Sequence, residues 1–165
     1  MSRRGHASPI VREIEPGDRR SLAGLLLRAN AVGERQCPGW LEPQALAKLG
    51  LNAPPVVFVC SLEHDLLGVA RLFERVEDQS FLDGPYVEPN KRKQHLATLL
   101  VEHAVIHAAA QGFRFLHLTA SRQAAGFFRR LGFEGMPSER PRTAQVDMCR
   151  QIGPLSPPRV HIAQM

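Results

Sequence analysis

Residues 81–133 decide the fold of this chain and read FLDGPYVEPNKRKQHLATLLVEHAVIHAAAQGFRFLHLTASRQAAGFFRRLGF. The segment predicts in turn a strand, a turn, a basic loop, a long helix, a second strand and a second helix. The predicted elements are Phe81–Val87, Thr98–Gln111, Phe113–Thr119 and Arg122–Leu131. Pro89 ends the first strand because proline cannot donate to a strand ladder. Strand, helix and strand in this order predict a parallel pair joined by a right-handed crossover.

A basic loop joins the first of these strands to the long helix. It contains Lys91, Arg92 and Lys93. Helix N-termini have unpaired N–H groups and about half a positive charge, so cations beside such an end predict a phosphate site. Close approach of backbone to a phosphate usually needs glycine, but with His95 present the loop can still work if its φ is negative, because the donors are backbone groups. The alternative is a solvated basic turn that caps an ordinary helix.

This stretch resembles the GNAT superfamily of N-acetyltransferases. Their acyl-CoA signature is a strand ending Val-x-Pro, followed by Arg-x-x-Gly-x-Gly/Ala at the start of a helix. Val87-Glu88-Pro89 and Arg92–Ala97 stand at those positions, with His95 in place of the first glycine. Many members also carry Asn-x-x-Ala-x-x-(Leu/Phe)-Tyr-x-x-x-Gly-Phe in the second helix. Here the corresponding residues are Ser121, Ala124, Phe127, Phe128, Gly132 and Phe133.

The resemblance implies both a fold and a cofactor. The fold is α/β: a mixed, mainly antiparallel twisted sheet of six to seven strands flanked by about four helices, the GNAT-like acyl-CoA N-acyltransferase fold. The acyl donor is acetyl-CoA, and no metal is required. The strand that splays from its neighbour would hold the pantetheine arm, and the basic loop would hold the phosphates. The residues implied in CoA binding are Pro85, Tyr86, Val87, Arg92, Lys93, Gln94, His95, Leu96, Ala97, Ser121 and Phe128.

The implied reaction is transfer of acetyl from acetyl-CoA to a primary amine by direct attack in a ternary complex. Segment 118–134 looks most like the acetyltransferase domain of N-acetylglutamate synthases and related small amino-acid acetylators, so the expected acceptor is an amino acid or a similar small molecule. Arg71, Arg140 and Arg142 are candidates to hold its carboxylate. We expect the acceptor pocket to comprise the loop Asn30–Pro43, the third and fourth strands, and the segment after Phe133.

The general base remains open between several side chains and a water relay. The candidates are Asp83, Tyr86, His117 and Glu74, all on predicted strands. Strand alternation predicts that Phe81, Asp83, Pro85 and Val87 share one face, and that Tyr86 and Glu88 share the other. His117 is expected near the end of its strand.

Phe128 stands where many members have a tyrosine general acid. A phenylalanine cannot protonate the leaving group, but a thiol pKa of about 8.5 makes thiolate a tolerable leaving group without help. The simpler interpretation is that Phe127 and Phe128 are core residues. His95 and Phe128 also suggest the main alternative function: a non-catalytic GNAT-fold module that binds acyl-CoA as a regulator.

The rest of the chain predicts one domain over residues 10–152, between a disordered arm (1–9) and a flexible Pro-rich tail (153–165). Further strands are expected at Ile10–Ile14, Val56–Leu62, Leu66–Val76 and Ala144–Ile152, with helices around Leu22–Ala29 and Gln44–Leu49. His103 and His107 lie four apart on the long helix, but no further ligand follows at a known metal spacing.

Composition narrows the range of partners. A net charge of +5 suits a polyanion such as a nucleotide cofactor or nucleic acid. One Trp and one Tyr leave little for base stacking, so nucleic acid is not expected. No apolar run approaches the roughly 18 residues of a membrane span. Three widely spaced cysteines and no apolar leader favour a cytoplasmic protein with free thiols. A homodimer is left open.

Overall fold

The computed structural model describes residues 7–29, 55–74, 77–91, 95–137 and 144–153. Within these ranges one sheet has seven strands in the order β1-β2-β3-β4-β5-β7-β6. The strands are β1 (Ile10–Glu13), β2 (Val56–Leu62), β3 (Asp65–Glu74), β4 (Gln79–Val87), β5 (Phe115–Ser121), β6 (Glu134–Gly135) and β7 (Gln145–Gln151). The helices are α1 (Arg19–Arg28), α3 (Leu96–Ala110) and α4 (Ala125–Arg130), with 3-10 turns η1 (Pro16–Asp18) and η3 (Pro89–Lys91).

The predicted α/β fold is confirmed. Every neighbouring pair of strands is antiparallel except β4 and β5, which the α3 crossover makes parallel. The described residues contain three α-helices rather than about four, and the helix expected at Gln44–Leu49 lies outside them. Helix α4 begins later than predicted because Ser121 and Ala124 form a turn, in which the Ala124 N–H donates to the Ser121 carbonyl at 3.0 Å.

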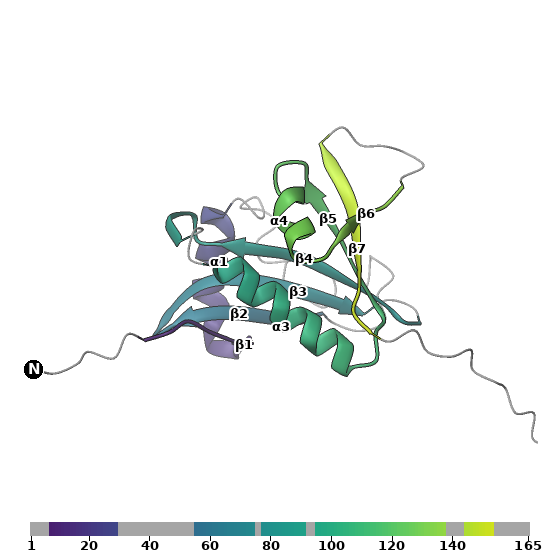
Figure 1. Cartoon of the computed structure of the whole chain (residues 1–165). Coiled ribbons are helices and arrows are strands. Elements are labelled where there is room, and N and C mark those ends of the chain that lie inside the picture. Colours follow the sequence, from purple (N-terminus) through teal and green to yellow (C-terminus); the bar gives the residue numbers. More distant parts are fainter. Residues whose placement is uncertain (1–6, 30–54, 75–76, 92–94, 138–143, 154–165) are drawn as a thin grey trace, which may run out of the picture.

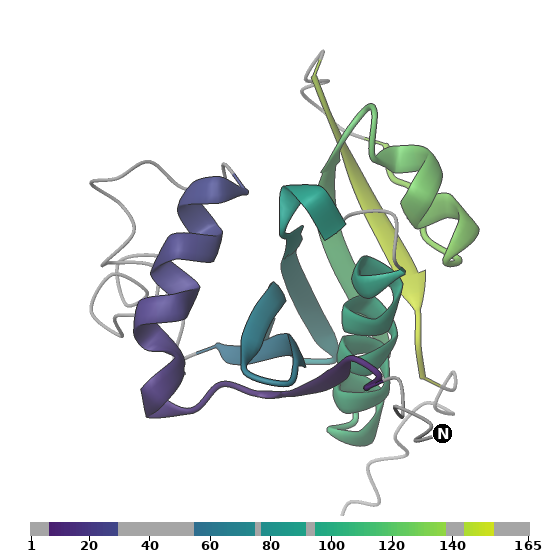
Figure 2. The same ribbon diagram turned by 90° about the vertical axis from the view of Figure 1, so that its left-hand side faces the viewer.

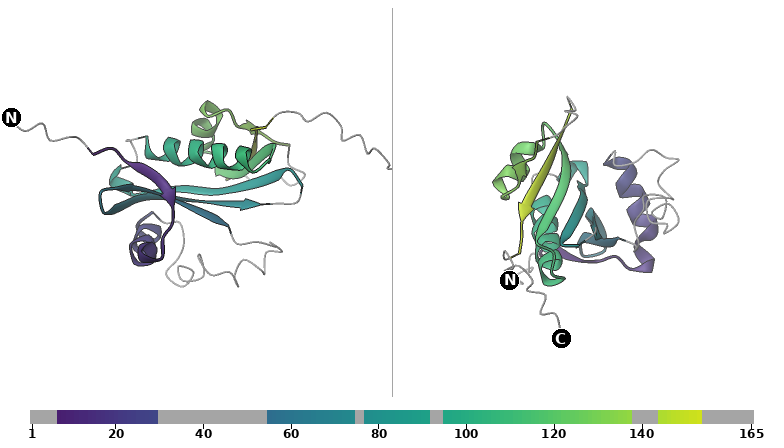
Figure 3. Two further views of the ribbon diagram at one scale, coloured as in Figure 1. Left: turned by 90° about the horizontal axis from the view of Figure 1, so that it is seen from below. Right: turned by 90° about the vertical axis from the view of Figure 1, so that its right-hand side faces the viewer.

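Helices cover both faces of the sheet (Figures 1–3). Helix α1 lies on one face, where Leu22, Leu25 and Leu26 pack against Val57 and Val59 of β2. Helices α3 and α4 lie on the other face. There the side chains of α3 meet residues of alternate strand positions, including Phe58, Ala70 and Leu72. Successive side chains of a strand point to opposite faces of the sheet, so the residues between these ones face α1.

Strand β4 changes its alternation part-way along. Leu82 and Val87 are both buried in the core beneath α3 although they are five residues apart. An odd separation on one face requires an irregularity between them. Gly84 supplies it with φ of 99°, and a Cβ at this position would lie 3.2 Å from the Val69 carbonyl oxygen.

The irregularity in β4 corrects the predicted distribution of its side chains. The β3–β4 register shifts between Val69 and Arg71. Asp83 and Tyr86 consequently lie on the same face, the one that α1 covers, and their side chains are joined by a hydrogen bond. Simple alternation placed them on opposite faces, and that prediction was wrong.

Strands β4 and β5 begin side by side and then diverge (Figure 1). Their pairing comprises Gln79 with Phe115, Ser80 with Leu116, and Phe81 with His117, and none of their later described residues pair. The buried Ser80 hydroxyl donates to the Phe115 carbonyl at 2.9 Å and closes this end. We call the V-shaped opening between the two strands the cleft, and the Phe81–His117 pair its vertex.

The two strands that border the cleft, β4 and β5, are each paired with another strand along the outer edge. Strand β4 pairs with β3 as far as Val87 opposite Gly68. Strand β5 pairs with β7 as far as Ser121 opposite Gln145. The inner edges therefore offer backbone groups that no neighbouring strand satisfies. Separately, no helix in the described ranges is long and apolar enough to cross a membrane.

The packing of α3 gives a matched test of the core. Leu100 is 0% exposed, whereas the adjacent Leu99 is 41% exposed. We expect Leu100→Ala to lower the free energy of unfolding by about 2–5 kcal/mol, because it leaves a cavity beneath the helix. Leu99→Ala, the same change on the solvent side, should cost less than about 1 kcal/mol. Urea titration of both variants measures the difference; equal losses would contradict this orientation of α3.

Candidate active site

The N-terminus of α3 lies just beyond the open end of β4. The chain leaves β4 at Val87, makes the η3 turn and enters α3 at Leu96. Arg28, at the end of α1, holds this turn: its Nε and Nη2 donate to the two Glu88 carboxylate oxygens at 2.9 and 2.8 Å. The unpaired N–H groups of α3 are therefore fixed at the mouth of the cleft.

Only part of the predicted phosphate loop lies in the described residues. Lys91 closes η3, and His95, Leu96 and Ala97 begin the helix. Arg92, Lys93 and Gln94 lie outside the described ranges. Leu96 is buried in the core beneath α3, so the helix start cannot shift freely relative to the sheet.

His95 has the backbone conformation of a glycine. Its φ is 59° and its ψ 16°, in the left-handed region, so the condition of a negative φ is not met. An L-residue pays roughly 1–2 kcal/mol for this conformation, although histidine accepts it more readily than most. The His95 carbonyl accepts the Leu99 N–H at 3.1 Å. The loop thus keeps the geometry that glycine would give at this signature position.

Asp83, Arg71 and Tyr86 form a closed polar cluster on the wall of β4. The Arg71 Nε donates to Asp83 Oδ2 at 2.9 Å, and its Nη2 bonds to the same oxygen. The Tyr86 hydroxyl donates to Asp83 Oδ1 at 2.5 Å. Donors therefore engage both carboxylate oxygens of Asp83. A substrate carboxylate at Arg71 would have to compete with Asp83.

Tyr86 is unsuited to act as a base. Burial raises the pKa of its hydroxyl above the ordinary 10, and the negative charge of Asp83 and the hydrogen bond to it add to the rise. The phenol therefore stays protonated at neutral pH and serves Asp83 as a donor. Of the four predicted candidates for the general base, Asp83 and Tyr86 are thus partners of each other.

The third candidate, His117, lies at the vertex. It is the third residue of β5 rather than near the strand's end, which corrects the prediction. Its Nε2 is hydrogen-bonded to Gln79 Oε1, and the Cys149 Sγ lies 3.9 Å from the same nitrogen. The ring stands on the face opposite α3, because Leu116 and Leu118 on either side point into the core beneath that helix.

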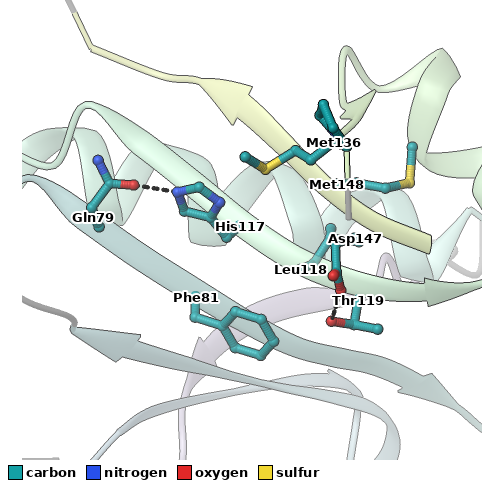
Figure 4. A pocket seen from close by; sticks show the side chains of 9 residues that line it. Gln79, Phe81, His117, Leu118, Thr119, Met136, Asp147 and Met148 are labelled. Carbon is teal, nitrogen blue, oxygen red and sulfur yellow. Dashed lines mark hydrogen bonds between the residues drawn. The ribbon is translucent and has the colours of Figure 1, made fainter. Parts of the chain in front are cut away.

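His117 borders a hollow of about 470 Å³ (Figure 4). In it the Thr119 hydroxyl donates to Asp147 Oδ1 at 2.8 Å, across the β5–β7 pair. The lining residues are Gln79, Phe81, His117, Leu118, Thr119, Met136, Pro137, Asp147 and Met148. A volume of this size is typical of pockets for small molecules.

The hollow overlaps in part with the region expected for the acceptor pocket. The fourth strand and the segment after Phe133 line it through Phe81 and Met136. The third strand does not line it, whereas β5 and β7 do. The loop Asn30–Pro43, together with Arg140 and Arg142, lies outside the described residues.

The remaining predicted residues have structural contacts. The Ser121 Oγ accepts the Ala124 N–H at 3.1 Å and so supports the turn into α4. Phe128 is buried, with its ring centroid 5.0 Å from that of Phe127 and 5.8 Å from that of Phe133. Pro85 and Val87 lie on the β4 wall of the cleft.

The two helical histidines are also packed. The rings of His103 and His107 stand edge-on to Phe58, with centroids 4.8 and 5.1 Å from that of Phe58. Burial lowers the pKa of His103, and the neighbouring His107 lowers it further. Among the described residues there is no group of three side chains that could hold a metal ion.

The sequence analysis did not identify three polar residues that line the hollow: Gln79, Thr119 and Asp147. Alternation could have identified Gln79, two residues before Phe81, and Thr119, two residues after His117. Asp147 could not have been found in this way, because its place depends on the β5–β7 register over 28 residues of sequence separation.

The sequence pattern of the acetyltransferase (GNAT) family matches residues 21–133. The chain belongs to this family. It is accordingly an acyltransferase, and the cleft and hollow lie within or beside the matched region. No curated protein matches the chain in sequence.

Solved GNAT structures share the fold at low identity. The ribosomal-protein-S18-alanine N-acetyltransferase of Escherichia coli is 17% identical, with 90% of this chain and 97% of that one covered and a TM-score of 0.69. The PaiA N-acetyltransferase of Thermoplasma acidophilum, solved with coenzyme A, is 15% identical (87% and 99% covered, TM-score 0.68). An aminoglycoside 6'-N-acetyltransferase, also solved with coenzyme A, is 15% identical (90% and 99%, TM-score 0.71).

Tyr86 gives a direct optical test of the Asp83 cluster, because it is the only tyrosine in the chain. In the folded protein, tyrosinate absorbance should appear well above pH 10, the ordinary pKa of the group. Asp83→Asn should lower the midpoint, because it removes the negative charge. The raised pKa adds stability that is present below pH 10 and lost as the pH rises through the folded value. Tyr86→Phe should abolish this loss; an unshifted midpoint in the folded protein would contradict the cluster.

The left-handed backbone at His95 predicts that His95→Gly stabilises this GNAT protein. Glycine adopts a positive φ without strain, and the gain should exceed the entropy it adds to the unfolded chain, leaving about 0.5–1 kcal/mol. The matched control is Gln111→Gly at the other end of α3, where φ is −81° and glycine should destabilise. Chemical unfolding measures both; a loss of stability in His95→Gly would refute the conformation.

Proposed function

We propose that this protein transfers acetyl from acetyl-CoA to the primary amino group of a small molecule by direct attack in a ternary complex. The observation that carries the proposal is the divergence of β4 and β5 beyond the Phe81–His117 pair. An open backbone edge thereby lies between an anion-binding helix end and a polar hollow. GNAT membership supports the reaction class, and two similar structures were solved with coenzyme A.

The donor half comprises the open edge of β4 and the start of α3. We expect the pantetheine arm to follow Pro85–Val87 and the phosphates to face Arg92–Ala97. The N–H groups at the start of α3 favour negative charge. The glycine-like backbone of His95 supports a close approach to the phosphates. An N–H of the open edge aimed at the thioester oxygen would contribute about 3 kcal/mol to transition-state stabilisation.

His117 is the proton acceptor that the contacts favour, because Asp83 and Tyr86 occupy each other. It takes a proton from the acceptor ammonium. The neutral nitrogen attacks the thioester carbonyl carbon; the C–N bond forms and the C–S bond breaks. CoA departs as a thiolate and takes up the second proton that the nitrogen loses. The products are the amide and the CoA thiol, and His117 returns its proton to water.

The acceptor we propose is an amino acid or a similar small molecule. The hollow of about 470 Å³ suits an acceptor of that size. The sequence resemblance to the acetyltransferase domain of N-acetylglutamate synthases also supports it. Arg71 is paired with Asp83, so the carboxylate would rely on Arg140 and Arg142.

A panel of amines with acetyl-CoA tests this function. The panel contains the free L-amino acids, spermidine and kanamycin, with thiol release as the readout and His117→Gln as the matched inactive control. Amino-acid turnover that His117→Gln lowers by about 10²-fold or more supports the proposal. Binding of acetyl-CoA without turnover of any amine would instead support the regulator alternative.

Arg92 gives the sharpest test of the donor half. Arg92→Glu places an anion beside the CoA phosphates and removes a charge-assisted hydrogen bond of about 1.5–3 kcal/mol. CoA binding should weaken by roughly 10²-fold or more, with little change in the melting temperature of the ligand-free protein. The control is Arg19→Glu, the same charge reversal at the exposed start of α1. Calorimetric titration with CoA and dephospho-CoA measures the affinity of each variant. An unchanged affinity for CoA in Arg92→Glu would contradict the assignment of Arg92–Ala97 to the CoA phosphates.

A further inference from the structure

A chain of hydrogen bonds runs from Arg114 to His117 at the vertex. The Arg114 Nε donates to Asp78 Oδ2 at 2.5 Å. The other carboxylate oxygen, Oδ1, accepts the Gln79 Nε2 at 2.9 Å. Gln79 in turn presents its Oε1 to His117 Nε2. Four side chains thus connect a guanidinium cation to the imidazole beside the hollow, and Figure 4 shows the last contact, between Gln79 and His117.

The start of this chain is anchored by backbone as well as by side chains. The Asp78 carbonyl accepts the N–H groups of Arg114 and Phe115, at 2.9 and 3.2 Å. Gln79 pairs with Phe115 in the first rung of the β4–β5 ladder. The carboxylate and the guanidinium are consequently held where the two strands are closest, and neither can turn away without breaking the vertex.

The chain determines which way the Gln79 amide points. Hydrogen bonding to Arg114 lowers the pKa of Asp78, which therefore stays an ionised, acceptor-only group at neutral pH. It must receive the NH₂ end of the amide. The carbonyl oxygen then faces His117, and because an amide oxygen only accepts, His117 Nε2 must carry the proton.

We propose that Arg114, Asp78 and Gln79 are positioning residues that hold His117 as the Nε2–H tautomer and so orient the imidazole that takes the proton of the acceptor amine. This inference rests on the proposed acetyltransferase function. The partner next to the ring is neutral, which matters for a base. A carboxylate in its place would stabilise the imidazolium and raise the pKa of the ring, whereas an amide orients the ring without adding charge.

Other charged or titratable groups also surround His117, and each could influence its titration. On β7, Cys149 stands opposite it in the ladder, and burial raises the pKa of that thiol. Glu134 of β6 pairs with Cys149 and acts on the same thiol. Among the described residues, the charged or titratable groups on or beside the neighbouring strands are Asp78, Asp83, Arg71, Arg114, Glu134, Asp147 and Cys149.

The first test reads the tautomer in the ligand-free protein. Long-range ¹H–¹⁵N spectra of ¹⁵N-histidine protein distinguish Nε2–H from Nδ1–H rings, and His117→Gln assigns the signal among the seven histidines. We expect Nε2–H in the wild type and a mixture of tautomers in Gln79→Ala. The matched control is Gln151→Ala: Gln151 lies on β7 and donates to the Gly153 carbonyl instead. A wild-type Nδ1–H ring, or no change in Gln79→Ala, overturns the proposal.

The second test reads the proton-accepting role from the pH profile of kcat/KM, with the fastest amine of the panel. Gln79→Glu puts a carboxylate on Nε2 and should move the acidic limb upward by about one pH unit, because the base is protonated more readily. Gln79→Ala should lower kcat/KM by about tenfold at neutral pH. Gln151→Ala should change neither quantity.

The two tests distinguish a failure of the proposed positioning of His117 from a failure of the proposed acetyltransferase function. Amine turnover together with an Nδ1–H ring, or with an unmoved limb in Gln79→Glu, overturns the positioning and leaves an acetyltransferase. An Nε2–H ring in a protein that acetylates no amine overturns the proposed function and the proton-accepting role with it.

Discussion

The structure depends on one constraint, the separation of β4 and β5 beyond the Phe81–His117 pair. Strands hydrogen-bond only while they lie about 4.8 Å apart, so each inner edge loses its partner once the strands diverge. The outer pairings with β3 and β7 carry the two walls. Helix α3 links the walls and brings its N-terminus to the open end. The proposed donor site, the hollow and the vertex all follow from this divergence.

The polar side chains around the cleft divide into two arrangements. Asp83 pairs with Arg71 and accepts a hydrogen bond from the Tyr86 hydroxyl, and these contacts support the β4 wall. Asp78 is also paired with an arginine, Arg114, but its second carboxylate oxygen accepts a hydrogen bond from the neutral amide of Gln79 and so orients that amide. The two ion pairs, Arg71–Asp83 and Arg114–Asp78, thus differ in role. Through Gln79, the second pair is connected to His117 beside the hollow.

The fold could be predicted because its signals are local. The apolar composition of α3, the continuous apolar run of β2 and the strand-ending Pro89 are each signals that act within a few residues. The errors arose where long-range geometry decides. Gly84 and the shifted β3–β4 register reverse the side-chain order of β4. The positive φ of His95, at the point where the chain enters α3, is not a local signal of a histidine in the sequence. Asp147 joins the hollow only through strand pairing.

The cleft also bears on how the molecule avoids association. Unpaired strand edges usually act as templates for another chain, and proteins protect them with charges, proline or a covering segment. Here the inner edges of β4 and β5 face each other and converge to a closed end. A strand from a second molecule would need a parallel-sided gap of constant width to add to the sheet. The V-shaped opening does not provide such a gap. The inner edges of β4 and β5 can therefore leave backbone N–H and C=O groups accessible to a flexible ligand without acting as a template for a strand of another molecule.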